Sequence, residues 1–372
     1  MRFFTNPFWR ATFFLSGMII GVGIYGIPYV FSRAGFVLGS LELLILTIVI
    51  TGIHLVYGEI VLRTREWHRL PGYAGIYLGS FAKKISIVSY LISFSGALAS
   101  YVFLGGHFLS NLISPDMAWT YAFFFFGAFL LFFSVRLSSR IDTAIIILIV
   151  LFIAGLFFYS IPHINSANLS GFDASEWFFP YGILMFALAG MAAIPDMAGF
   201  LEHDPKLLRK AIITGSVLPA VLYFLFALAV VGVSGSGTTK EAMLGISQVL
   251  GGNILFFGSI IGILSTFNGF IILGSVLKGM MHLDLGFGWR MSWFLTVLIP
   301  FLFIFSGMSD YLAIIGFVGS FSIALDGVMT LLIYRKAVLN GNRPSEYSMH
   351  IHGLFLLVIG VLFLAGFAHQ FL

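Results

Sequence analysis

The chain has 372 residues, of which 59% are hydrophobic and 9% are charged, and its mean hydropathy is +1.04. This composition excludes an ordinary soluble protein, and no polar stretch is long enough for a separate soluble domain. We therefore predict one all-α integral membrane domain over residues 1–372 that lies in a lipid bilayer. The absence of Cys excludes disulfides and thiol catalysis. Basic loops beside a membrane explain the net charge of +4, so we expect no nucleic-acid partner.

Apolar runs of about 20 residues, the length that crosses roughly 30 Å of hydrocarbon, recur along the whole chain. They predict eleven transmembrane helices, near residues 9–34, 36–62, 85–113, 117–135, 141–161, 180–201, 207–233, 243–281, 289–305, 309–334 and 351–370. Residues 1–10 carry two arginines but lack a small-residue cleavage site, so we expect the first span to be uncleaved.

The positions of Lys and Arg predict the orientation in the membrane. With the N-terminus in the cytoplasm, 17 basic residues fall in cytoplasmic segments and two, Arg33 and Lys240, fall outside. Cytoplasmic loops of membrane proteins carry this excess of Lys and Arg. We therefore expect a protein of the plasma (cytoplasmic) membrane with a cytoplasmic N-terminus and an external C-terminus.

The first span contains an unusual cluster of helix breakers, GMIIGVGIYGIP over residues 17–28. Gly costs roughly 1 kcal/mol and Pro about 3 kcal/mol relative to Ala inside a helix, so the cluster favours an unwound segment. Unwound backbone survives at membrane depth only where protein buries it or where it lines a wet cavity. We predict a discontinuity near Gly21 to Ile24 that exposes backbone groups to a substrate or an ion.

The sixth span repeats this feature with FALAGMAAIPD over residues 186–196, which predicts a second discontinuity near Ala189 to Ala193. Spans one to five and six to ten then form two units of five, at about 9–161 and 180–334, with an extra helix at about 351–370. An odd number of spans per unit makes the two units inverted repeats. Interrupted helices at matching positions of such repeats are typical of a transporter's substrate site.

The sequences GMIIGVGIYGIPYVFSRAG and FALAGMAAIPDMAGFLEHDPKLLRKAI resemble those of the amino acid/auxin permease family. That family belongs to the amino acid, polyamine and organocation superfamily with the leucine-transporter fold. The resemblance covers essentially the whole chain. It implies secondary transport of an amino acid, expected to be neutral, by alternating access, with spans one and six as the substrate-binding pair.

An amino acid presents a carboxylate and an ammonium group, and broken helices can bind both through their backbone. Free N–H groups and the positive helix end after the first break suit the carboxylate, for which we expect Gly21, Val22, Gly23 and Ile24. Exposed carbonyls before the second break suit the ammonium group, with Phe186, Ala187 and Ala189 as candidates and Gly190 as the break. The side-chain pocket is expected to involve Phe186, Leu188, Tyr101 and Phe270.

The resemblance also implies a sodium site, because sodium-coupled members of the superfamily use a Ser/Thr pair on span eight together with carbonyls of span one. The matching positions are Gly17, Ile20, Gly262, Ser265 and Thr266. Two features differ from relatives: Ile24 stands where some have a sodium-binding Asn, and span five lacks the Lys of some proton-coupled members. We expect no cofactor other than this ion.

Three acids inside predicted spans, Glu42, Asp196 and Asp326, keep proton coupling open, since an ionised carboxylate at membrane depth costs at least about 2.5 kcal/mol. Asp196 and Asp326 are our candidates for coupling or gating. Glu59 lies four residues before Arg63, which predicts a structural or gating ion pair.

Other classes of function have less support. The spans show neither a metal-binding cluster nor a Ser with a base, so we do not predict an enzyme. The lack of a repeated pore-lining polar stripe argues against a channel. A non-transporting amino-acid sensor with the same fold remains an alternative.

Overall fold

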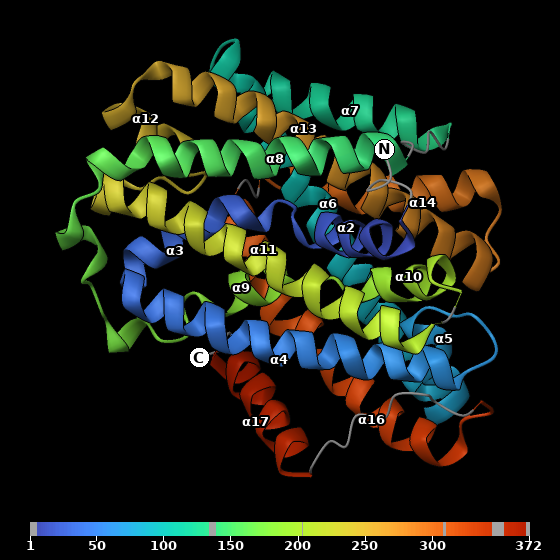
Figure 1. Ribbon diagram of the computed structural model, residues 1–372. Coiled ribbons are helices and arrows are strands. Elements are labelled where there is room, and N and C mark those ends of the chain that lie inside the picture. The colour runs from blue at the N-terminus through green and yellow to red at the C-terminus, as the bar shows by residue number, and fades with distance from the viewer. Residues whose placement is uncertain (1–5, 134–138, 203, 308–309, 344–352, 370–372) are drawn as a thin grey trace.

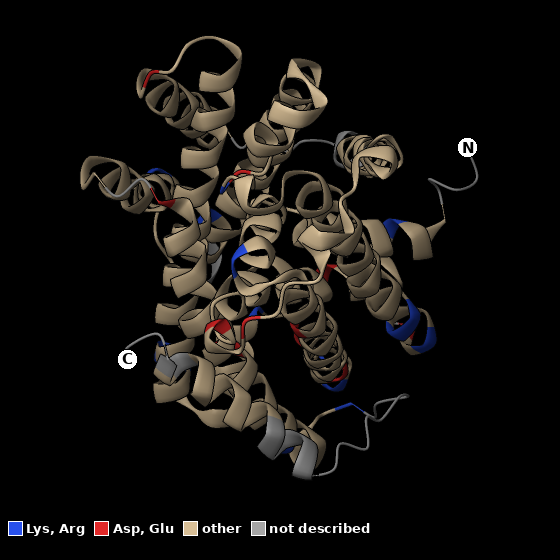
Figure 2. Cartoon of the chain, turned by 90° about the vertical axis from the view of Figure 1, so that its left-hand side faces the viewer, with Lys and Arg blue, Asp and Glu red and all other residues tan. Residues whose placement is uncertain are grey.

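The computed structural model describes residues 6–133, 139–202, 204–307, 310–343 and 353–369. Its regular elements are helices packed as one bundle, in which α4, α8 and α11 run side by side (Figure 1). Charged residues are sparse over this bundle (Figure 2). Within the described ranges, seven helical segments are long and apolar enough to span a membrane, and one bent pair forms a further span. The prediction of an all-α integral membrane protein is confirmed.

The first predicted span is broken. Helix α2 (Pro7–Ile19) ends at Ile19 and α3 (Gly23–Ala34) begins at Gly23, with a bend of 56° between them. The break therefore covers residues 20–22 and begins one residue earlier than predicted. Gly23 and Ile24 belong to the first turn of α3, whose N–H groups have no partner within the helix.

The sixth predicted span is broken where the sequence indicates. Helix α9 (Tyr181–Leu188) ends at Leu188. After Ala189 and Gly190 the short 3-10 turn η4 (Met191–Ala193) begins, and α10 (Ile194–Phe200) follows it. Pro195 occupies the second position of α10, where its missing N–H costs nothing because that group has no intrahelical acceptor. The inverted-repeat relation between residues 9–161 and 180–334 stays a prediction.

The other predicted spans correspond in order to helices of the structure. These are α4 (Phe36–Arg63), α6 (Ser80–Leu112), α7 (Ala118–Phe132), α8 (Ser139–Ser160), α11 (Pro205–Ser234), α13 (Gly252–Gly279), α14 (Trp289–Phe305), α15 (Tyr311–Val318) with α16 (Ala324–Asn340), and α17 (Gly353–His369). Helices α15 and α16 join through a π-helical turn, η7 (Gly319–Ile323).

The structure divides one predicted span and adds one helix. The stretch 243–281 is long enough to be tilted or to begin with a partly extramembrane piece, and it contains two helices, because α12 (Met243–Leu250) ends at Gly251, whose φ of +96° is incompatible with a right-handed helix, and α13 starts anew. Residues 63–84, expected as a loop, contain the helix α5 (Leu70–Leu78). This helix is too short for the length criterion by which membrane spans are recognised.

Candidate substrate site

A cavity of about 100 Å³ lies between the two broken spans. The two breaks, together with α4, α6, α13 and the α15–α16 span, supply its wall. Of the predicted substrate-binding residues, the structure places five along this wall: Gly21, Tyr101, Phe186, Ala189 and Gly190. Most of the remaining wall is apolar, including Met18, Ile50, Ile53, Phe94, Ala97, Leu273 and Val318.

Gly21 is the point at which the backbone of the first break meets α6. A Cβ atom built on Gly21 would overlap the hydroxyl oxygen of Tyr101. That hydroxyl also hydrogen-bonds with the backbone of Val22. The backbone of the break and the Tyr101 hydroxyl therefore meet at the wall of the cavity, beside the N-terminal end of α3, which is a suitable place for a carboxylate.

Other residues predicted for the cradle and pocket lie outside this wall. Gly23 packs against Ala187, because a Cβ on Gly23 would come within 2.7 Å of the Ala187 Cβ, so its role is the close approach of α3 to α9. Val22 and Ile24 are buried in the core, as is Leu188. Phe270 is also fully buried and faces α7, where its ring lies 6.2 Å from the ring of Phe123. Phe270 does not line this cavity, and its expected contact with a substrate stays a prediction.

Two buried side chains that sequence analysis did not assign to the site hold the breaks in place. The Tyr223 hydroxyl of α11 donates to the carbonyls of Ile19, at 2.7 Å, and Ala187, at 3.0 Å, and thus joins the two broken spans. His54 of α4 lines the cavity, and its Nε2 accepts the backbone N–H of Gly190 at 3.3 Å. The His54 Nδ1 then lies 2.9 Å from the Ser216 hydroxyl. No pattern in the sequence distinguished these residues from other polar groups in apolar helices.

The far end of the cavity is polar. Asp326 of α16 and Ser93 of α6 both line it, and their exposed fractions are 4% and 6%. Asp326 hydrogen-bonds with the Ser89 side chain, but its Oδ1 has no hydrogen-bond partner within the described residues. The Ser93 hydroxyl has none there either. The third predicted acid, Glu42, lies away from this site, in a separate cavity between α4, α9 and α17.

Three of the five predicted sodium ligands lie together. The hydroxyls of Ser265 and Thr266 donate to the Gly262 carbonyl, at 3.1 and 2.7 Å. Ser265 also lies 3.1 Å from the Tyr25 hydroxyl, which connects α13 to α3 just after the first break. Oxygen atoms without formal charge are suitable ligands for a hard cation, so this donor set fits sodium. Gly17 lines a different cavity, described next, and Ile20 is buried in the first break.

A larger cavity, of about 570 Å³, lies between α2, α8, α10 and α13. We call this larger cavity the vestibule, and Met18 lines both it and the candidate substrate cavity. Asp196 borders the vestibule and pairs with Arg69 at 3.1 Å. Arg69 also donates to the Ala192 carbonyl at 2.8 Å. The loop between α4 and α5 is therefore tied to the second half of the broken sixth span.

The predicted pair of Glu59 with Arg63 is present within α4. The guanidinium group donates two hydrogen bonds to one carboxylate oxygen, at 2.8 and 2.7 Å. The Glu59 side chain is fully buried, whereas Asp196 retains 22% exposure. Neither acid lines the substrate cavity, and their role in coupling or gating stays a prediction.

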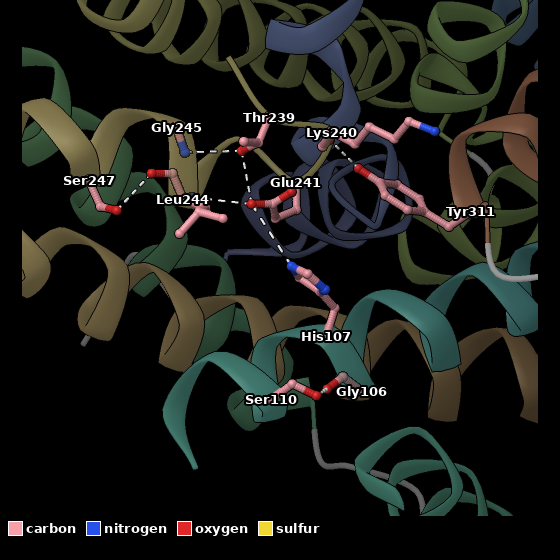
Figure 3. Close-up of polar contacts among 10 residues, drawn as sticks. All are labelled: Gly106, His107, Ser110, Thr239, Lys240, Glu241, Leu244, Gly245, Ser247 and Tyr311. Atoms are coloured by element: carbon pink, nitrogen blue, oxygen red, sulfur yellow. Dashed lines mark hydrogen bonds and ion pairs between the residues drawn. The ribbon is translucent and has the colours of Figure 1, made fainter. Parts of the chain in front are cut away.

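The opposite end of the bundle is closed by the segment between α11 and α12 (Figure 3). Lys240 forms an ion pair with Asp310 at the start of α15, and the Tyr311 hydroxyl donates to the Lys240 carbonyl. Glu241 accepts hydrogen bonds from the Thr239 hydroxyl at 2.8 Å and the Leu244 N–H at 3.3 Å. We call residues 238–245 the lid.

The lid is expected to depend on pH through Glu241. Burial raises the pKa of this carboxyl, but its contact with His107, 3.9 Å away, and its hydrogen bonds with backbone and Thr239 outweigh burial and lower it. A lowered folded-state pKa stabilises the lid at neutral pH, and this contribution is lost as the pH falls through that pKa. Hydrogen exchange of residues 238–245 should therefore accelerate in acid. Glu241→Gln should remove this acceleration, and an unchanged pH profile in that variant would contradict the assignment.

Comparison with known proteins agrees with this architecture. The model of the tryptophan/tyrosine permease family matches residues 4–248, more than half of the chain. No curated protein sequence matches the chain. Among solved structures, the crystal structure of MhsT in complex with L-phenylalanine matches with a TM-score of 0.70, over 97% of each chain and at 17% sequence identity.

The structural match shows that the chain has the leucine-transporter fold, as the helix breaks predicted. The matched family has a different description from the amino acid/auxin permeases that the sequence motifs resemble, although the expected fold is the same. The chain is an integral membrane protein and belongs to the tryptophan/tyrosine permease family.

Proposed function

We propose that the protein is a secondary transporter of an aromatic amino acid, coupled to a cation gradient. The observation that carries this proposal is the cavity between two helix breaks, with the first break and Tyr101 at one end and apolar walls beyond them. Such a site binds a carboxylate through backbone and a large side chain through apolar contact. The family description, which refers to tryptophan and tyrosine, supports an aromatic substrate.

The path through the membrane is proposed from the two ends of the cavity. The vestibule beyond Met18 is bordered by Arg10 and Arg69, which sequence analysis places on the cytoplasmic side. The lid, with Lys240, then lies on the external side. This state is closed to the outside by the lid, and movement of α10 away from the Arg69 loop would open the substrate cavity to the cytoplasm.

Two cations have support as the coupling ion. The oxygen atoms of Gly262, Ser265 and Thr266 support sodium, which this cluster would hold together with carbonyls of the first break, Gly17 and Ile20 being the expected ones. The buried carboxyl of Asp326 supports a proton, since an ionised carboxylate at membrane depth is costly and the described residues give Asp326 no ion-pair partner. Asp196 is less suited to carry a proton because it is paired with Arg69.

Uptake into proteoliposomes tests the function and identifies the ion. The purified full chain is expected to accumulate tryptophan, tyrosine or phenylalanine when an inward gradient of sodium or of protons is imposed. If sodium couples, Ser265→Ala with Thr266→Ala removes the stimulation by sodium, whereas Asp326→Asn retains it. If a proton couples, Asp326→Asn removes pH-driven uptake and the double variant retains it. Binding without uptake under either gradient would identify a sensor and contradict the transport proposal.

A further inference from the structure

The candidate substrate cavity has two unused hydrogen-bonding atoms at the end opposite the first break. They are Asp326 Oδ1 and Ser93 Oγ, both buried and both without a partner within the described residues. Leaving a buried polar atom unpaired costs about 1–3 kcal/mol, and more if the group is charged. A carboxyl presents an acceptor oxygen whether it is ionised or neutral, so the polar end offers an acceptor in either state.

The spacing of this polar end suits one class of substrate. Ser93 and Tyr101 lie on the same helix, eight residues apart, which corresponds to about 12 Å along α6. Phe94 and Ala97 line the cavity between them. An aromatic amino acid with its carboxylate at Gly21 and Tyr101 would therefore direct its ring along an apolar wall toward Asp326.

We propose that Asp326 and Ser93 form a subsite that accepts an N–H or O–H donor at the far end of the substrate's aromatic ring. The inference rests on the proposed function and adds the basis of selection among aromatic amino acids. The indole N–H of tryptophan and the phenol O–H of tyrosine are such donors, and phenylalanine has none. A site built to receive such a donor rejects the analogue that lacks it, because the site's own polar groups stay unpaired.

Equilibrium binding to the purified full chain tests the subsite without requiring transport. Tryptophan or tyrosine is expected to bind about tenfold more tightly than phenylalanine, because phenylalanine would leave the buried acceptor unpaired. Asp326→Leu should reduce that affinity to about the level of phenylalanine, because the acceptor oxygen is removed. Asp326→Asn keeps an acceptor oxygen and should retain the preference. Ser93→Ala should also reduce the preference for tryptophan or tyrosine over phenylalanine.

Ser95→Ala provides the matched control. Ser95 is also buried on α6 without a hydrogen-bond partner within the described part of the chain, but it does not line the cavity. Its removal should leave the preference intact. Equal binding of all three amino acids to the parent protein would overturn the subsite and leave the proposed function standing. Binding of none of them would instead overturn the proposed function. A preference lost as fully in Asp326→Asn as in Asp326→Leu would also contradict an acceptor role.

Discussion

Replacing Gly21 by alanine is expected to weaken substrate binding by about 100-fold or more, which corresponds to about 2.7 kcal/mol. The new methyl group would overlap the Tyr101 hydroxyl, at the point where the first break and α6 meet the cavity. The collision should displace either the hydroxyl or the break, and both are proposed to hold the substrate carboxylate. Overpacking of this kind also costs typically about 1–3 kcal/mol of stability. Equilibrium binding and thermal unfolding of the purified protein measure the two effects.

Two further variants separate loss of the site from loss of the fold. Gly155→Ala in α8 is the matched control, because a Cβ atom there has no heavy atom within 4 Å. It should leave binding unchanged and should not destabilise the protein, since Ala favours a helix more than Gly does. In Gly21→Ala with Tyr101→Phe, the nearest remaining ring atom, Cζ, lies 3.1 Å from the new Cβ, so much of the lost stability should return. Binding should not return, because the hydroxyl is absent. Normal affinity in Gly21→Ala would show that the substrate binds elsewhere.

The helix breaks could be predicted because their cause is local. Clusters of Gly and Pro in two apolar runs disfavour helix whatever surrounds them, and the structure breaks both runs within a residue or two of the expected positions. The sequence also identified Tyr101 and Phe186, which line the cavity. The short helix α5 was missed because hydropathy over a membrane-length window does not detect a helix of 9 residues.

The remaining details of the site depend on packing between distant segments. Whether Gly23 faces a ligand or Ala187 is decided by how closely α3 approaches α9, and no local pattern encodes that distance. Phe270 was chosen among many phenylalanines, and the fold turns it toward α7. Tyr223 and His54 act on backbone atoms 36 to 204 residues away along the chain. Their roles follow from the fold and not from the residues beside them.

Removing Arg69 is expected to disrupt transport more than binding. Arg69→Leu would leave the Asp196 carboxylate and the Ala192 carbonyl without this partner. The hydrogen bond from the Trp67 indole N–H to the Pro195 carbonyl, at 3.0 Å, would remain, so the attachment of the loop to the second half of the sixth span would be weakened. The side chains of Arg69 and Asp196 are 26% and 22% exposed, so water already screens part of the attraction that the variant would lose. Leaving these groups unpaired should lower the free energy of unfolding by about 1–3 kcal/mol. Uptake should fall at least tenfold, an order-of-magnitude effect of a lost gate, while the affinity for substrate stays nearly constant.

Arg65 provides the matched comparison, because it is a basic residue in the same loop whose side chain is exposed. Arg65→Leu should leave both stability and uptake near those of the parent protein. Asp196→Asn combined with Arg69→Leu removes the unpaired charge and should recover much of the lost thermal stability, yet uptake should stay low because the Arg69 contacts to Asp196 and Ala192 are still missing. Uptake that returns together with stability would show that the Arg69–Asp196 pair supports the fold alone. In that case α10 is not the cytoplasmic gate, and the opening of the substrate cavity must involve other contacts around Met18.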